Sequence, residues 1–271
     1  MKRSLPLAGR RKGRVLAIDL GSARTQILVV GADGVLDEPT QVACSPTGAV
    51  IAAGRDAWVA AAEGRGRLLS PVRGGVVRDP VSCVHMLRIL LRKSADWATH
   101  PDVVVSLAAT AHGRDPSVSA AVVASATGGR VLPIEAGLAA GIGADLDIVQ
   151  GGPRLVCDVG AGVTEMAVVA DGHVLSSVAT RLALSAYDTR SEQALRLVEQ
   201  LLRRTLDALP DRAAGDAAAA PLLLVGGGAL RADLVSRLGA RCRMQVEVPA
   251  RPRDVVTRGL ARCVTGPLTA A

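Results

Sequence analysis

The chain has almost no aromatic residues: its 271 positions include no Phe, one Tyr and two Trp. Because 49% of the residues are nevertheless hydrophobic, the core must be built from Val, Leu, Ile and Ala, without large aromatic anchors. A chain of this length exceeds the usual size of a single core, so we expect two domains or two tightly joined lobes.

Cysteine pairs, histidines at metal spacing and long apolar runs are missing as well. The chain has no CxxC pair, and its five cysteines are widely separated: Cys44, Cys83, Cys157, Cys242 and Cys263. This pattern favours buried, reduced thiols over disulfides or a metal site. No apolar run reaches the roughly 20 residues that span a bilayer, and no apolar segment follows the N-terminal charges as in a signal peptide. We therefore expect a cytoplasmic protein.

The first 14 residues contain no acid, which places most of the net charge at one end. They supply six of the seven net positive charges, from Lys2, Arg3, Arg10, Arg11, Lys12 and Arg14. A basic tail over residues 1–13 can lie on an anionic membrane, gaining about 1 kcal/mol per basic residue. It can also touch nucleic acid or stay solvated. Because the rest of the chain is nearly neutral, we expect no specific nucleic-acid partner.

What the sequence does contain is an internal repeat. RVLAIDLGSARTQILVVGADGVL begins at Arg14, and RLVCDVGAGVTEMAVVADGHVL begins at Arg154. Each copy reads as an apolar strand, Asp-x-Gly-x-x-x-Thr, a second strand, an Asp-Gly turn and a third strand. The repeated positions are Asp19, Gly21, Thr25 and Asp33-Gly34 in one copy, and Asp158, Gly160, Thr164 and Asp171-Gly172 in the other. Two copies of one β-hairpin unit predict two related lobes, at residues 14–146 and 147–271.

Strand and helix patterns alternate after each copy, which predicts an α/β fold with mixed sheets flanked by helices. The clearest helix begins after Ser191 as N-cap and closes at Pro210. Further strands are expected at 101–109, 131–136 and 221–225, and further helices at 117–129, 137–144, 229–240 and 254–264.

The glycine turns are suited to binding phosphate. A strand that ends in Asp-x-Gly before a tight turn presents backbone N–H groups at the rim of a sheet, with small residues leaving room for an anion. The carboxylate at the strand end suits contact with a hydrated Mg²⁺. One such loop is more often an ordinary hairpin, but two that face each other across a cleft could hold a polyphosphate from both sides. The run Gly226 to Gly228, between a strand and a helix, could add close backbone approach and a positive helix end, or be a plain turn.

These motifs together resemble a known superfamily. IDLGSARTQILV, IEAGLAAGIGADL, VCDVGAGVTEMAVV, LLLVGGGAL and DVVTRGLARCV are similar, in this order, to the five motifs of the actin, sugar-kinase and heat-shock-chaperone ATPases. Within it, EPTQVA, PVRGGVVRD and MLRILLRK make the chain most similar to the MreB/Mbl group of bacterial actins. The resemblance covers roughly residues 14–265. It implies an actin-like, ribonuclease-H-like duplicated fold of two lobes with a nucleotide cleft between them.

The resemblance also implies roles for individual residues. ATP or ADP would be held by two phosphate loops and a nucleoside loop: Gly21, Ser22, Ala23, Arg24 and Thr25; Gly160, Ala161, Gly162, Val163 and Thr164; and Gly226, Gly227, Gly228 and Ala229. Asp19 and Asp158 would face Mg²⁺ through water.

The chain departs from the family pattern in its length. A subdomain of about eighty residues, which closes over the adenosine and supplies filament contacts, normally precedes the long amphipathic helix. Here SSVATRLALSAYDTR runs almost directly into SEQALRL, which leaves the upper part of the second lobe missing near residues 185–191.

A second departure concerns hydrolysis. The family has an acid immediately before a proline at the first connecting helix, where the acid positions the attacking water. Ala136 stands at that place, and the catalytic candidate Glu135 lies one position away, on the opposite face of a short strand. Without this carboxylate, hydrolysis could lose a factor of about 10²–10⁴. Val163 and Ala161 replace a hydroxyl residue and a glycine, and Arg24 replaces Asn, either to contact phosphate or to point to solvent.

Trp97, in the polar loop SADWATHP, corresponds to a loop that in bacterial actins often carries a membrane-dipping residue. Trp suits the bilayer interface, so Trp97 and the basic tail could form two weak anchors at the inner face of the cell membrane. A Trp packed on its own lobe is the alternative.

The leading hypothesis is an actin-like cytoskeletal or scaffold protein of cell shape or cell-wall synthesis, with nucleotide binding weak or lost. Its partners would be further copies of itself or a related bacterial actin, and cell-wall synthesis proteins. The alternative is an active, polymerising ATPase. A small-molecule kinase ranks lower, because no further acid stands beside the glycine loops to act as a base.

Overall fold

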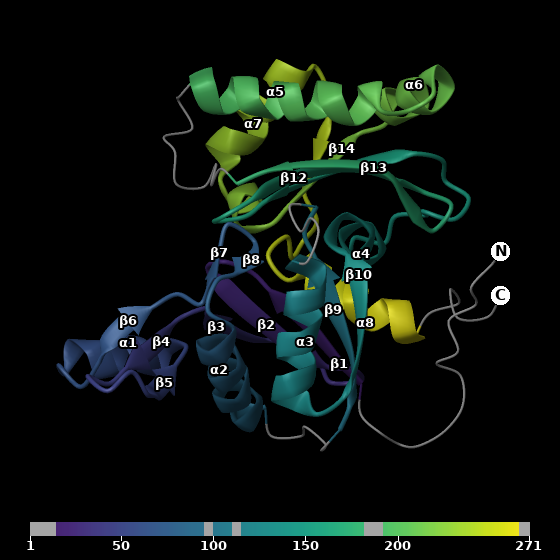
Figure 1. The fold of residues 1–271 in the computed structure, drawn as a ribbon. Coiled ribbons are helices and arrows are strands. Elements are labelled where there is room, and N and C mark those ends of the chain that lie inside the picture. Colours follow the sequence, from purple (N-terminus) through teal and green to yellow (C-terminus); the bar gives the residue numbers. More distant parts are fainter. Residues whose placement is uncertain (1–14, 95–99, 110–114, 182–191, 266–271) are drawn as a thin grey trace.

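The computed structural model describes residues 15–94, 100–109, 115–181 and 192–265, and it has two lobes stacked one above the other (Figure 1). Each lobe is built on a five-stranded mixed sheet. The sheet of the first lobe has the order β10-β9-β1-β2-β3. These strands span β1 (Val15–Leu20), β2 (Arg24–Val29), β3 (Leu36–Pro39), β9 (Asp102–Leu107) and β10 (Arg130–Glu135).

The sheet of the second lobe repeats this topology as β13-β12-β11-β14-β15. In each lobe the first strand pairs antiparallel with the second and parallel with a later strand on its other side. The predicted duplication is thereby confirmed. The strands are β11 (Arg154–Val159), β12 (Thr164–Ala170), β13 (His173–Thr180), β14 (Leu222–Val225) and β15 (Val246–Glu247).

Helices cover the outer faces of both sheets (Figure 1). In the first lobe α2 (Pro80–Lys93) buries Met86, Leu87, Leu90 and Leu91 in the same core as Leu16 and Ile18. Asp79 caps this helix by accepting a hydrogen bond from the backbone of Ser82, and Pro80 starts its first turn. The other outer helices are α3 (Asp115–Thr127) in the first lobe, and α5 (Glu192–Asp207), α6 (Asp211–Ala219) and α7 (Ala232–Cys242) in the second.

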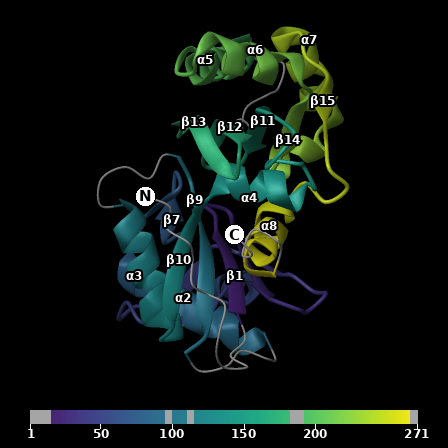
Figure 2. The same ribbon diagram turned by 90° about the vertical axis from the view of Figure 1, so that its right-hand side faces the viewer.

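Two helices lie between the sheets, α4 (Ala136–Gly143) and α8 (Val255–Thr265), as Figure 2 shows from the side. They cross with backbones in contact, because a side chain on Gly143 would clash with the Val255 carbonyl and one on Gly259 with the Ala139 carbonyl. α4 continues from β10 of the first lobe but packs on β11 and β12, whereas α8 follows β15 and packs on β1, β2 and β9. The two lobes therefore exchange their last helices, and the boundary predicted at residues 146/147 stays a prediction.

The first lobe carries an inserted small sheet, β5-β4-β6, with its own helix α1 (Arg55–Ala62) and a short hairpin beyond it. The core under α1 consists of alanines, Ala43, Ala57 and Ala60. The strands are β4 (Val42–Cys44), β5 (Val50–Ala53) and β6 (Arg67–Leu69), and the hairpin is β7 (Val72–Arg73) and β8 (Val76–Val77).

Several details differ from the sequence predictions. Pro210 follows the end of α5 as predicted, but it is also the N-cap of α6, an alanine-rich helix that the sequence analysis did not include. Gly227 and Gly228 belong to a 3₁₀ turn, η2 (Gly227–Leu230), with Gly226 as its N-cap, and α7 begins only at Ala232. The prediction that these glycines lead directly into an α-helix N-terminus is therefore wrong.

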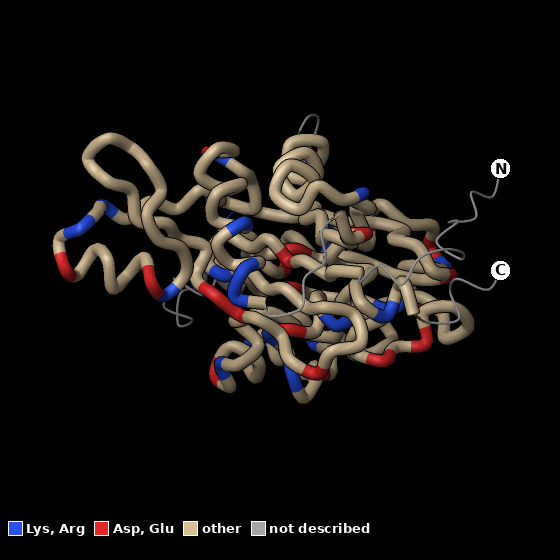
Figure 3. Tube along the Cα trace, turned by 90° about the horizontal axis from the view of Figure 1, so that it is seen from below, with Lys and Arg blue, Asp and Glu red and all other residues tan. Residues whose placement is uncertain are grey.

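The thiols and charges agree with the expectations. All five cysteines are free, with Cys83 and Cys157 buried and the others half-buried. Basic and acidic residues are interspersed along the body, as Figure 3 shows from below. None of the helices in the described ranges is long and apolar enough to cross a membrane.

Candidate functional site

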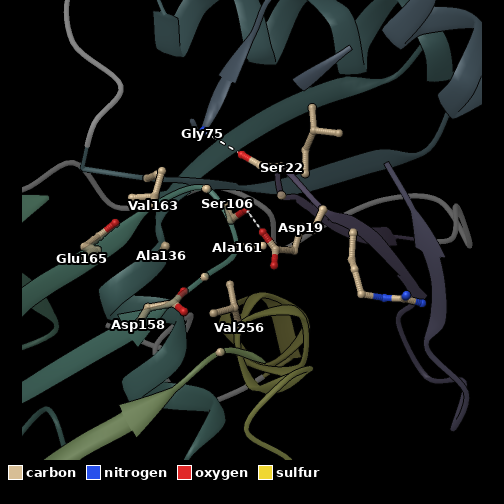
Figure 4. Close-up of a pocket in the computed structure, with 18 of the residues that line it drawn as sticks. Asp19, Ser22, Gly75, Ser106, Ala136, Asp158, Ala161, Val163, Glu165 and Val256 are labelled. Atoms are coloured by element: carbon tan, nitrogen blue, oxygen red, sulfur yellow. Dashed lines mark hydrogen bonds between the residues drawn. The ribbon is translucent and has the colours of Figure 1, made fainter. Parts of the chain in front are cut away.

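A cavity of about 250 Å³ lies between the two lobes, where both repeated turns meet (Figure 4). The first turn contributes Gly21 to Arg24, the second Gly160 to Val163, and the strand ends contribute Asp19 and Asp158. The sequence prediction that two duplicated turns oppose one another across the interlobe cleft is confirmed.

The two turns have the same construction. The Gly21 N–H donates to the Arg24 carbonyl at 3.0 Å, and the Gly160 N–H donates to the Val163 carbonyl at 2.9 Å. A Cβ on either glycine would lie under 3.0 Å from that same carbonyl, so only glycine allows the turn. Because these turns leave the following backbone at the cavity wall, both lobes present N–H groups to one space.

The turns also touch each other at the cavity mouth. A side chain on Gly162 would clash with Ser22, and the Ser22 hydroxyl accepts a 2.8 Å hydrogen bond from the Gly75 N–H of the β7–β8 hairpin. Gly75 itself lines the cavity. This hairpin therefore belongs to the site, although the sequence gave no reason to include it.

The two aspartates differ in their surroundings. Ser106, at the end of β9, donates to Asp19 Oδ1 at 2.5 Å. Asp158 has no hydrogen-bond donor among the described residues, and Gly226 lies so close that a side chain there would clash with its carboxylate. Burial raises the pKa of Asp19, an effect that the bond from Ser106 partly offsets. Burial and then the charge of Asp19 raise the pKa of Asp158 to about 7.

The predicted nucleoside loop lies only partly in the cavity. Gly226, with a φ of +81°, and Gly227 line it. Gly228 and Ala229 are buried beneath the strand, where a Cβ on Gly228 would clash with Val159.

Other predicted residues lie beside the cavity. Thr25 and Thr164 are fully buried in their hairpins, and Thr25 bonds to Thr40 at 2.9 Å. Glu135 is exposed and does not line the cavity, whereas Ala136 does. Arg24 lines the cavity, and its guanidinium is bonded to Asp37 instead of pointing freely to solvent: its Nε donates to the Asp37 carboxylate at 2.5 Å and its Nη2 to the Asp37 carbonyl at 2.8 Å.

An acid that the sequence reasoning overlooked lines the cavity as well. Glu165, 5% exposed, follows Thr164 on β12 and accepts a 2.8 Å hydrogen bond from the Ala109 N–H. The expectation that no further acid stands beside the glycine loops was therefore wrong. Burial raises the pKa of Glu165 to about 7, although backbone N–H groups of Ala109 and Gly137 bond to it. Its position directly after the repeated threonine was the available signal.

Ser106, Gly75, Ser119 and Arg253 also line the cavity without having been predicted. They come from four separate segments, which only the folded chain brings together. Trp97, the basic tail and residues 185–191 lie outside the described residues.

A duplicated fold with two glycine turns and two aspartates facing across an interlobe cavity defines an actin-like protein. Comparison with known proteins agrees, because the MreB/Mbl protein family matches residues 13–196. The chain belongs to this family, and the predicted membership and fold class are confirmed.

Individual relatives show the extent of the similarity. The cell shape-determining protein Mbl of Bacillus cereus is 27% identical over 180 residues, 65% of this chain and 54% of that protein. MreB of Escherichia coli is 30% identical over 183 residues, 64% of this chain and 53% of that protein. The chain spans about half the length of the curated relatives it matches. Only residues 181–191 separate β13 from α5.

Solved structures share the fold at low identity. MreB5 of Spiroplasma citri, bound to AMPPNP, has a TM-score of 0.83 at 18% identity, covering 94% of this chain and 96% of that one. The MamK double helical filament has a TM-score of 0.75 at 14% identity, covering 94% and 99%.

Proposed function

We propose that this chain is an actin-like cytoskeletal or scaffold protein of bacterial cell shape or cell-wall synthesis. In this proposal it binds ATP or ADP weakly in the interlobe cavity and hydrolyses ATP slowly or not at all. The observation that carries the proposal is that both glycine turns line the cavity together with Ala136, the residue that the family resemblance aligns with the water-positioning acid.

Nucleotide binding is supported by the chemistry of the cavity. The turns at Gly21–Arg24 and Gly160–Val163 offer backbone N–H groups to phosphates from both lobes. Crystal structures of MreB5 bound to AMPPNP and to ADP share this fold.

The residues present fit a magnesium ion. Asp19 and Asp158 are two carboxyls of like charge shielded from water, and the raised pKa of Asp158 indicates that no cationic side chain compensates for them. A divalent cation would relieve this repulsion. Asp19 and Asp158 would hold Mg²⁺ through water, and the ion would neutralise phosphate charge.

Slow hydrolysis is supported by the side chains at the end of the cavity where the terminal phosphate of ATP would lie. Ala136 offers no proton acceptor, and Glu135 is exposed outside the cavity. The Glu165 carboxylate does line the cavity, but the backbone of Ala109 occupies one of its oxygens. The same constraint disfavours a kinase that would use Glu165 as a base.

The polymerising ATPase is the second candidate, since the filament-forming MamK shares the fold. Self-association, contacts with cell-wall synthesis proteins and a place at the inner face of the membrane are proposed from family membership.

Calorimetric titration with Mg-ATP and Mg-ADP tests the proposal, with phosphate release measured on the same samples. We expect binding weaker than micromolar and a hydrolysis rate that Ala136→Glu raises by about 10²-fold or more. Micromolar binding with steady phosphate release by the unaltered protein would instead establish the ATPase. No heat at millimolar nucleotide would refute nucleotide binding and leave only a scaffold.

A further inference from the structure

Arg253 occupies an unusual place at the junction of two cavities. It lines the interlobe cavity of about 250 Å³ and also a second one of about 370 Å³ beside β3 and the segment before α8. Gln26 is the other residue that lines both. The two spaces therefore adjoin at this arginine.

The backbone of Arg253 is held while its side chain is not. Gln26 of the opposite lobe donates to the Arg253 carbonyl at 3.2 Å and accepts from Thr257 at 2.7 Å. The neighbouring Pro252 carbonyl accepts from the Gly226 N–H at 2.8 Å. These bonds tie the segment to the floor of the cleft.

The Arg253 guanidinium has no hydrogen-bond or ion-pair partner in the described part of the chain. The nearby arginines differ, because Arg251 and Arg258 both pair with Asp254, at 3.5 and 3.0 Å. An exposed cation on a fixed backbone, at the wall of a binding cavity, is available for a ligand.

The sizes of the cavities indicate which part of a ligand would reach it. A cavity for a whole small-molecule ligand usually measures about 300–1,000 Å³, so a nucleotide with its phosphates at the glycine turns would extend beyond the first one. The adjoining space at Arg253 is where the nucleoside would continue. None of the described residues that line either cavity is aromatic, so no ring is available to stack on a base.

We propose that Arg253 binds the nucleoside end of the nucleotide by laying its guanidinium plane on the base. An arginine can stack on an aromatic face in this way, which a lysine does less well. This inference depends on the proposed nucleotide binding. In it, the Arg253 side chain stacks on the base in place of an aromatic ring, which neither cavity offers among the described residues.

Calorimetric titrations test this with two probes, Mg-ADP and inorganic tripolyphosphate with Mg²⁺, which lacks a nucleoside. Arg253→Ala is expected to weaken Mg-ADP binding about 3- to 30-fold and to leave the tripolyphosphate signal as in the unaltered protein. Arg253→Lys, which keeps the charge, is expected to stay weakened by about threefold. Arg212→Ala, on the outer helix α6, is the control for loss of one charge and should change neither affinity.

The outcomes separate this inference from the proposed function. Unchanged Mg-ADP affinity in Arg253→Ala, full recovery in Arg253→Lys, or an equal loss for both probes would overturn the stacking role. If the unaltered protein binds no Mg-ADP or Mg-ATP, the proposed function falls and this inference with it. Equal thermal unfolding midpoints of the variants would show that the affinity changes are local.

Discussion

The two lobes share one strand order but differ in what surrounds it. Both sheets place an aspartate at the end of the first strand and a glycine two residues later. The first lobe then inserts a small sheet with α1 and the β7–β8 hairpin, whereas in the second only residues 181–191 separate β13 from α5. The shared strands and turns form most of the cavity wall, and the β7–β8 hairpin of the first lobe adds Gly75 to it.

The surroundings of the aspartates differ as well. Asp19 has Ser106 as a donor, whereas the strand position beside Asp158 is Val225, which cannot donate. Arg24 closes the first turn and pairs with Asp37, whereas Val163 closes the second. The first lobe therefore supplies partners for Asp19 and Arg24, whereas the second supplies no donor for Asp158 among the described residues.

The largest expected effect concerns the point where the lobes exchange helices. Gly259→Ala would drive a methyl group into the Ala139 carbonyl of α4, and overpacking against backbone should lower the free energy of unfolding by about 3 kcal/mol or more. Gly143→Ala should behave alike, because it meets the Val255 carbonyl. Urea unfolding measures both.

The matched control is Gly215→Ala in α6, where the added methyl group meets nothing within 4 Å. It should stabilise the protein by about 0.5–1 kcal/mol. Equal effects at Gly215 and Gly259 would contradict the tight crossing.

Asp158→Asn should show that the two aspartates contribute differently to the pH dependence of the free energy of unfolding. Because the native pKa of Asp158 is raised to about 7 from an ordinary value near 3.9, the unfolded chain loses this proton first as pH rises. The stability of the ligand-free protein should therefore fall between about pH 4 and 7. Asp158→Asn should remove part of this slope and add about 2–4 kcal/mol at pH 8.

Asp19→Asn should increase the free energy of unfolding at pH 8 by less than Asp158→Asn does, because Ser106 already stabilises the ionised Asp19. Urea unfolding at pH 5 and pH 8 without Mg²⁺ compares the variants, and Glu165, whose pKa is also raised, supplies the slope that remains in both. A gain at pH 8 as large for Asp19→Asn as for Asp158→Asn would mean that the lobes do not differ.

Ser106→Ala should make the first lobe resemble the second. The loss of the hydroxyl that donates to Asp19 should cost about 1 kcal/mol at pH 8. Ser119→Ala is the control, because Ser119 lines the same cavity without a hydrogen bond among the described residues. Equal unfolding midpoints of the two variants would argue against a stabilising Ser106–Asp19 bond.

The smallest effect is expected from Arg24→Val, which gives the first turn the residue of the second. The Arg24–Asp37 pair is partly exposed, so its loss should cost less than about 1 kcal/mol. Mg-ADP affinity should stay within about twofold of the unaltered protein. A tenfold loss in calorimetry would instead return Arg24 to a phosphate-binding role.

Local patterns predicted much of the fold. The alternation of apolar strands with Asp-x-Gly turns predicted both sheets, and small residues at the turns predicted the walls of the cavity. Patterns failed at two places. The short helix α6, whose apolar residues are alanines, was not predicted, and the glycines at 226–228 lead into a 3₁₀ turn that resembles a helix start in sequence.

By itself the sequence determined the duplicated hairpins, the paired aspartates and the need for glycine at both turns, because these depend on the conformation of neighbouring residues. Only the tertiary structure decided that α4 and α8 each pack on the sheet of the other lobe, that Ser106 donates a hydrogen bond to Asp19, and that Glu165 and Arg253 line the cavity. Such contacts join segments far apart in the chain. They follow from how two sheets pack around crossing helices, and no local pattern of residues encodes that packing.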